Sequence, residues 1–173
     1  MQERSGVVTF KGGPLTLLGP DVQVGQAAPD FTVVDEEFKP VRLLDFAGQV
    51  VLISAVPSLD TSVCSIQTKR FNNEAAKLVD KITVLTISED LPFAQKRFCS
   101  NEKVQGHQVL SDHVYRQFGQ RYGLLIKDMM LLARTVLVIG KDGRIAYRQI
   151  VSELTEEPDY QAALAAAKDA AQK

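Results

Sequence analysis

A short apolar run followed by an amphipathic segment gives the clearest pattern of hydrophobic and polar positions in the chain. Residues 50–56 are rich in β-branched side chains and almost continuously apolar, which is typical of a central strand covered on both faces. Pro57 ends this strand because proline has no N–H to donate to a neighbour. Over residues 62–80 apolar side chains recur every three to four positions and predict a helix: Ile66, Phe71, Ala75, Leu78 and Val79.

Turn residues between apolar runs predict two hairpins. Lys11-Gly12-Gly13-Pro14 lies at the centre of an N-terminal hairpin over about residues 7–18, and Gly140-Lys141-Asp142-Gly143 connects strands 135–139 and 145–151. Further strands are expected at residues 31–34, 41–44, 81–88 and 109–112, and further helices at 90–101, 113–122 and 159–173.

The order of these elements predicts the architecture. Residues 50–88 form a β-α-β unit, whose two strands are expected to run parallel with a right-handed crossover. The hairpins add antiparallel strands, so we expect an α/β sandwich with a mixed central sheet. Asp90 is the candidate cap of helix 90–101. This helix carries Phe93, Ala94, Phe98 and Cys99. The helix 113–122 presents Val114, Phe118 and Tyr122 at helical spacing, and its aromatic rings are expected to pack in the core.

Composition limits the classes of protein to which the chain can belong. With 173 residues and a hydrophobic fraction of 45%, residues 1–173 are expected to form one domain with a substantial core. The 20 basic and 21 acidic residues nearly balance, which argues against nucleic-acid binding and a polybasic membrane surface. The sequence has no apolar stretch of the roughly 20 residues that a membrane helix needs, and the amino terminus lacks a secretory apolar core. A cytoplasmic protein is therefore expected.

Cys64 is the first candidate for chemistry. It lies in the first turn of helix 62–80, just after the carboxyl end of a strand, where unpaired N–H groups and the helix dipole favour a thiolate. Asp60, Thr61 and Ser62 are all candidates for the cap of this helix. A lone cysteine is also often a small, buried and inert hydrophobe. Position alone leaves both interpretations open.

The sequence offers little support for a metal or cofactor. Two cysteines in a reducing compartment favour a transient rather than a permanent disulfide, and the spacing of Cys64 and Cys99 excludes a CxxC motif. Together with His107 and His113 they lack the tight clustering of zinc ligands, and both histidines are expected to lie in solvated loops. Because the chain has no Walker loop, GxGxxG or HExxH motif, no cofactor is expected.

The stretch Pro57-Ser58-Leu59-Asp60-Thr61-Ser62-Val63-Cys64 resembles the P-x-x-x-T/S-x-x-C signature of the peroxiredoxins, in the form of their thiol peroxidase branch. Further matches extend over most of the chain: Ala28-Pro29-Asp30-Phe31, Leu91-Pro92-Phe93-Ala94-Gln95, Arg97-Phe98-Cys99, Ala133-Arg134 and Glu157-Pro158-Asp159-Tyr160. Family members often have glycine at the position of Ser62. Serine also starts helices well, so the chemistry is expected to be unaffected.

This resemblance implies a thioredoxin-like fold and a bacterial peroxidase that uses two cysteines of one subunit. Cys64 would be the peroxidatic residue, oxidised by hydrogen peroxide or an organic hydroperoxide to a sulfenate. Cys99 would be the resolving residue, forming an intrasubunit disulfide with Cys64. The family also implies thioredoxin as reductant, a homodimer and a preference for organic hydroperoxides.

Three more residues gain roles from the resemblance, and each also has a simpler interpretation. Thr61 would hydrogen-bond the peroxide, but could serve only as a helix cap. Arg134 would place a positive charge near the thiolate, but could be a solvated charge at a strand end. Pro57 would shape and dry the rim of the pocket, but could only end the strand. Likewise Cys99 could pack beside Phe98 without reacting. The resemblance favours the catalytic interpretation of each.

Two alternatives to a peroxidase remain. A general thiol–disulfide oxidoreductase is disfavoured by the absence of CxxC. A redox sensor or holdase with this fold would bind a partner and turn over little peroxide. Rapid peroxide consumption without a stoichiometric partner would therefore indicate an enzyme.

Overall fold

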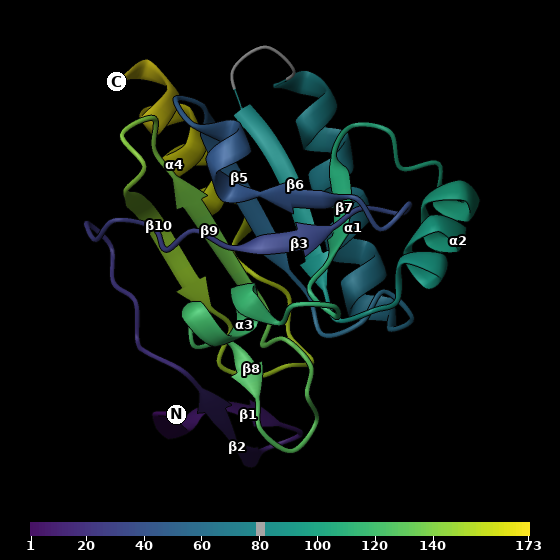
Figure 1. Cartoon of the computed structure of the whole chain (residues 1–173), viewed down its shortest axis with the longest axis vertical. Coiled ribbons are helices and arrows are strands. Elements are labelled where there is room, and N and C mark those ends of the chain that lie inside the picture. Colours follow the sequence, from purple (N-terminus) through teal and green to yellow (C-terminus); the bar gives the residue numbers. More distant parts are fainter. Residues whose placement is uncertain (79–81) are drawn as a thin grey trace.

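A computed structural model describes residues 1–78 and 82–173 and shows a sheet with helices on its faces (Figure 1). Seven strands form the sheet in the order β10-β9-β5-β6-β7-β3-β4. In chain order they are β3 (Thr32–Val34), β4 (Pro40–Arg42), β5 (Val50–Ala55), β6 (Ile82–Ser88), β7 (Gln108–Ser111), β9 (Thr135–Ile139) and β10 (Ile145–Ile150). The helices are α1 (Ser62–Lys77), α2 (Pro92–Glu102), α3 (Gln117–Arg121) and α4 (Tyr160–Gln172), with a 3-10 helix at Leu43–Phe46.

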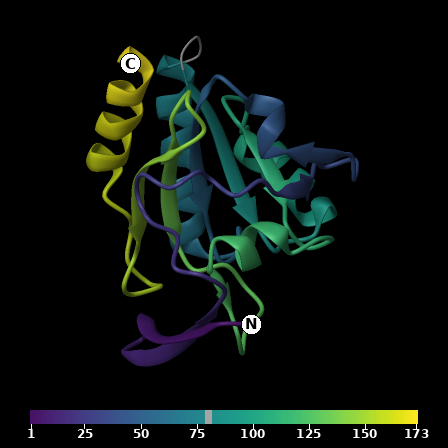
Figure 2. The same cartoon turned by 60° about the vertical axis from the view of Figure 1, so that its left-hand side comes forward.

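Strand β5 lies inside the sheet, between β9 and β6, and all its residues are buried. It pairs in parallel with β6 and antiparallel with β9, which confirms the predicted mixture of strand directions. Since side chains alternate along a strand, Val51 and Ile53 face one core, together with Phe118 of α3. Val50 and Leu52 face a second core, made with α1 and α4. Figure 2 shows α4, in yellow, along its side of the sheet.

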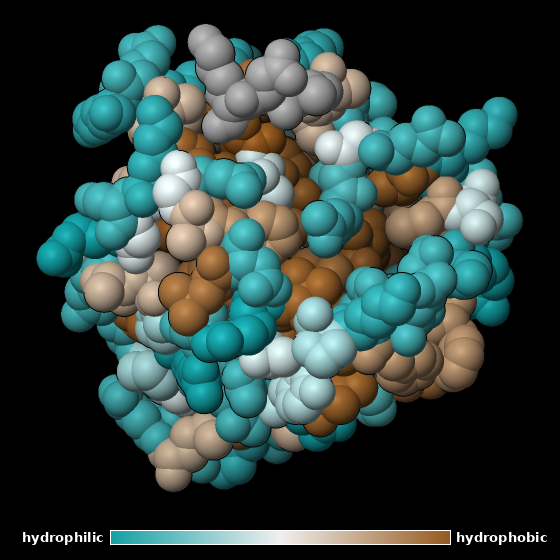
Figure 3. All heavy atoms as spheres, turned by 45° about the horizontal axis from the view of Figure 1, so that its top comes forward, coloured by the Kyte–Doolittle hydropathy of each residue, from teal (hydrophilic) through white to brown (hydrophobic). Residues whose placement is uncertain are grey.

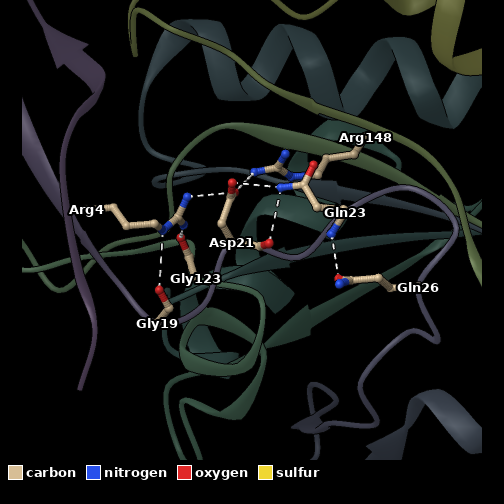
Figure 4. Close-up of polar contacts among 7 residues, drawn as sticks. All are labelled: Arg4, Gly19, Asp21, Gln23, Gln26, Gly123 and Arg148. Carbon is tan, nitrogen blue, oxygen red and sulfur yellow. Dashed lines mark hydrogen bonds and ion pairs between the residues drawn. The ribbon is translucent and has the colours of Figure 1, made fainter.

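A separate three-stranded sheet contains the N-terminal hairpin. Strand β1 (Glu3–Phe10) begins earlier than the predicted hairpin, β2 is Gly13–Leu18, and β8 (Leu125–Ile126) pairs with β2. Strand β8 is not predicted from the sequence, because two residues are too few for a periodic pattern. Near this sheet, Asp21 accepts hydrogen bonds from both Arg4 and Arg148 (Figure 4), which connects the hairpin to β10.

The apolar pattern located most elements within two or three residues, and the differences have local causes. Helix α3 begins at Gln117 rather than near residue 113, because Arg116 adopts a left-handed conformation with φ 52°. Asp90 does not cap α2. Leu91 takes that position without a side-chain bond, and the Asp90 carboxylate instead binds the loop before α1. The predicted positions Val79, Asp80 and Lys81 lie outside the described residues.

Three apolar side chains of the predicted helical segments are exposed: Ile66, Phe93 and Val114. Phe93 is 70% exposed, and its ring lies beside the exposed ring of Phe38 at a centroid distance of 5.3 Å. In the space-filling view, hydrophilic residues cover much of the surface and hydrophobic ones gather toward the middle of the face (Figure 3). Among residues 1–78 and 82–173, the model contains no helix of the length and hydropathy that crossing a membrane requires.

Candidate active site

Cys64 lies in the first turn of α1, at the end of the loop that follows β5. Its side chain is fully buried, so the cysteine faces the protein interior rather than solvent. It belongs to a small apolar cluster with Val56, Leu59 and Val109. Pro57, directly after the strand, is buried as well.

Thr61 occupies the N-cap position of α1 but does not act as a side-chain cap. Its hydroxyl instead donates to the carbonyl oxygen of Ser58 at 3.0 Å. The interpretation of Thr61 as a simple cap is therefore wrong. The oxygen keeps its lone pairs for a further hydrogen bond, at an exposed position beside the start of the helix.

Arg134 is 2% exposed, so its interpretation as a solvated charge is wrong. Its Nε and Nη2 donate to the carbonyl oxygen of Leu154 at 3.1 and 2.7 Å, and its Nη1 donates to Oε1 of Gln67 at 2.9 Å. Among the residues that the structure describes, it has no carboxylate partner and two of its five N–H groups remain unbonded. A buried cation without a counter-ion is unfavourable. The site is therefore suited to an anion.

Gln67 is a residue that the sequence analysis missed. It is fully buried on α1, three residues after Cys64 and therefore on the same face of the helix. Its Nε2 donates to the Ser54 hydroxyl at 2.7 Å while its Oε1 accepts from Arg134. A polar residue at a core position of the helix, one turn from the cysteine, is the signal that could have identified it.

Cys99 lies on α2 and is partly buried. With Phe98 and Val104 it packs against the apolar cluster that contains Cys64. Both cysteines are free thiols, so they border the same cluster without a disulfide. Burial, and to a smaller extent the carboxylate of Glu36, raises the pKa of Cys99 to about 11. In this arrangement Cys99 is protonated and is a poor nucleophile.

A groove of about 430 Å³ runs between the start of α1 and helix α2, and Thr61, Ser65 and Phe98 contribute to its lining. Two ion pairs lie beside it: Arg97 of α2 with Asp60 of the loop before α1 at 3.8 Å, and Lys69 of α1 with Glu102 of α2 at 3.1 Å. The groove gives a small molecule access to the segment that precedes Cys64.

The two histidines differ in their surroundings. His113 is exposed. His107 lies in the loop before β7, as predicted, but is half-buried rather than solvated, with its Nε2 2.9 Å from the Thr86 hydroxyl. Burial lowers the pKa of His107 to about 4, so the ring is neutral near pH 7. Within the described residues, no three side chains of the metal-ligating kinds lie together as a metal site would require.

Comparison with known proteins agrees with this geometry. The model of the Redoxin family matches residues 23–164, and the chain therefore belongs to the redoxin family. It is 52% identical over 163 residues to a thiol peroxidase of Halalkalibacterium halodurans, covering 94% of this chain and 98% of that protein. It is 49% identical over 161 residues to a thiol peroxidase of Bacillus subtilis, covering 93% and 96%.

Solved structures give the same result for the fold. A peroxiredoxin-like protein from Aquifex aeolicus superposes with a TM-score of 0.90 at 41% identity, covering 96% of this chain and 97% of that one. A thiol peroxidase from Chromobacterium violaceum superposes with a TM-score of 0.83 at 19% identity, covering 95% and 97%, and supports the fold alone. The predicted thioredoxin-like fold is confirmed. The protein is a thiol-dependent peroxidase of the peroxiredoxin type.

Proposed function

We propose that Cys64 reduces hydrogen peroxide and organic hydroperoxides, and that Cys99 resolves the product as an intrasubunit disulfide. The observation that carries the proposal is the environment of Arg134. Its guanidinium is buried, has no carboxylate partner among the described residues, and is fixed by Gln67 to the face of α1 on which Cys64 lies. A thiolate at Cys64 is the anion that this arrangement would stabilise.

In the first step the Cys64 thiolate attacks the terminal peroxide oxygen. The S–O bond forms as the O–O bond breaks, and the departing alkoxide takes up a proton and leaves as an alcohol, or as water from hydrogen peroxide. The Thr61 oxygen would accept the hydrogen of the peroxide, and the unbonded N–H groups of Arg134 would stabilise the negative charge that moves onto oxygen. Pro57 would keep water away from the sulfur.

In the second step the Cys99 sulfur displaces the hydroxyl of the Cys64 sulfenic acid. A disulfide forms and water leaves, with its second hydrogen supplied by the Cys99 thiol. Since the cysteines lie on different helices and the geometry of a disulfide is narrow, the first turn of α1 and helix α2 must unwind locally. Hydrogen exchange should therefore show weaker protection of both segments in the disulfide form. Equal protection in the two forms would contradict the unwinding.

The remaining parts of the cycle complete the proposal. A dithiol reductant, thioredoxin, would attack the disulfide and restore both thiols. Because this step needs a reducing compartment, a cytoplasmic location belongs to the same proposal. A homodimer and a preference for organic hydroperoxides are further elements that rest on membership of the family.

The test is catalytic turnover. With thioredoxin, thioredoxin reductase and NADPH present, wild type should consume many equivalents of cumene hydroperoxide, and Cys64→Ser should consume none above background. If consumption by wild type stops near one equivalent, the protein is a sensor rather than an enzyme in this cycle.

A further inference from the structure

The carboxylate of Asp90 joins two segments that lie far apart in the sequence. Asp90 follows β6 and precedes α2 by two residues. Its Oδ1 accepts a hydrogen bond from the Ser58 hydroxyl at 2.7 Å. Its Oδ2 accepts from the Leu59 N–H at 2.8 Å and from the Ser88 hydroxyl at 2.7 Å. The Asp90 carboxylate therefore bonds to the loop before Cys64 and lies in the segment that leads to Cys99.

On one side the bonds lead toward Cys64. The Ser58 carbonyl oxygen accepts the hydroxyl of Thr61 at 3.0 Å and its N–H at 3.2 Å. Leu59, held by its N–H, is buried in the apolar cluster of Cys64. The Asp90 carboxylate thus fixes the loop that positions both Thr61 and the start of α1.

On the other side the bonds lead toward Cys99. The Ser88 hydroxyl, which donates to Asp90, accepts a bond from Nε2 of Gln95 at 3.0 Å. Gln95 lies on α2 one turn before Cys99, is 1% exposed, and also donates to the carbonyl oxygen of Leu110 at 2.8 Å. Hydrogen bonds therefore run without interruption from the Cys64 loop through Asp90 to the Cys99 helix.

We propose that Asp90 is a positioning residue that holds the Cys64 loop and the Cys99 helix in the dithiol arrangement, and that its hydrogen bonds must break before the disulfide can form. The inference rests on the proposed function, because it concerns how Cys99 reaches Cys64. Hydrogen bonds to a charged carboxylate are stronger than those between neutral groups. A small number of them can therefore control how often the two segments open.

This anchoring controls the competition between two fates of the Cys64 sulfenic acid. In one, Cys99 attacks the sulfur, the S–O bond breaks, and a disulfide and water result. In the other, a second hydroperoxide transfers an oxygen atom to the sulfur, giving a sulfinic acid and an alcohol. The closed arrangement keeps Cys99 partly buried on α2 and protonated, and so prolongs the life of the sulfenic acid. Weaker anchoring favours the disulfide.

The test compares two variants that weaken the anchor with one that does not. Ser58→Ala removes one donor to the carboxylate, and Asp90→Asn replaces an accepting oxygen by an N–H donor without changing the shape. Ser111→Ala is the matched control, since the Ser111 hydroxyl bonds the carbonyl oxygen of Asp90 at 2.7 Å and leaves the carboxylate untouched.

Each reduced protein is mixed with excess cumene hydroperoxide, and intact masses give the ratio of sulfinic acid to disulfide. Ser58→Ala and Asp90→Asn should lower this ratio at least about fivefold, the scale expected for losing one bond to a charged group. Ser111→Ala should match wild type. The rate of the first oxidation is measured separately and shows whether a variant changed the reactivity of Cys64 itself. A purely structural role of Asp90 would leave the ratio of sulfinic acid to disulfide unchanged.

Three outcomes would overturn the inference. The first is a wild-type ratio in both anchor variants, or in Ser58→Ala alone if Asp90→Asn does not fold. The second is a change in Ser111→Ala as large as that in Ser58→Ala. The third is a wild type that forms no Cys64–Cys99 disulfide at all; this result removes the proposed function as well, and wild type alone reveals it.

Discussion

The guanidinium of Arg134 and the side-chain amide of Gln67 meet inside the protein, with Nη1 2.9 Å from Oε1 and both residues almost fully buried. Through this contact the helix that carries Cys64 also holds the cation. A change at Gln67 should therefore affect the chemistry of a sulfur that lies one turn away along α1.

Replacing Gln67 by Leu tests this relationship. The variant loses the acceptor for Arg134, so the guanidinium is no longer fixed beside α1. The second-order rate of Cys64 oxidation, followed by stopped flow, should fall about tenfold, equivalent to about 1.4 kcal/mol of lost transition-state stabilisation. Thr68→Val is the control, because the neighbouring Thr68 is also buried and its hydroxyl has no partner within the described residues. Equal rates for Gln67→Leu and Thr68→Val would contradict the positioning role.

Substitutions at Thr61 can distinguish a role in the oxidation of Cys64 from a role in capping α1. Because its hydroxyl bonds the Ser58 carbonyl oxygen rather than an N–H of α1, Thr61→Val should lower the free energy of unfolding by less than about 1 kcal/mol. The same change should slow Cys64 oxidation about a hundredfold, the scale for losing a hydrogen-bonding group at a reacting centre. Thr61→Ser should restore most of the rate. A Thr61→Val variant that is clearly unstable but oxidises at the normal rate would return Thr61 to the role of a cap.

The buried carboxyl group of Glu89, just before α2, predicts how the free energy of unfolding depends on pH. Glu89 is 7% exposed, and burial followed by the nearby carboxylate of Asp112 raises its pKa well above the ordinary 4.5, although Arg116 at 3.8 Å opposes this. The folded protein therefore keeps the proton of Glu89 at a pH where the unfolded chain has lost it. Stability from this group is complete below the ordinary carboxyl pKa and is lost as pH rises through the raised value.

Glu89→Gln removes this titration. Urea unfolding between about pH 5 and pH 7 should show wild type losing stability with rising pH, and the variant losing less. Asp142→Asn, at an exposed turn position, serves as the control and should keep the wild-type slope. Parallel slopes for wild type and Glu89→Gln would show that Glu89 does not retain its proton in the folded state.

Features that depend on neighbouring residues could be predicted from the sequence, whereas features that depend on residues far apart in the chain could not. Strand β9 lies at residues 135–139 as predicted, because a continuous apolar run depends only on neighbouring residues and burial. Local pattern also located Cys64 at a helix start. The left-handed Arg116 that delays α3 has no such signal in the sequence.

The polar contacts of the site could not be predicted, because their partners are brought together only by the fold. Asp90 was assigned to its own helix, whereas its carboxylate bonds Ser58, 32 residues earlier in the chain. Nor could the burial of Arg134 be predicted, because its partner Gln67 lies 67 residues away in the chain.

The central claim is that one peroxide oxidises Cys64 to a sulfenic acid and that Cys99 then forms a disulfide with it. The most direct measurement adds one equivalent of cumene hydroperoxide to reduced protein and counts free thiols by mass spectrometry in wild type, Cys64→Ser and Cys99→Ser. We predict that wild type loses both thiols within one monomer, that Cys99→Ser stops at a Cys64 sulfenic acid, and that Cys64→Ser stays reduced. Survival of both wild-type thiols, or oxidation of Cys64→Ser at Cys99, would contradict the account.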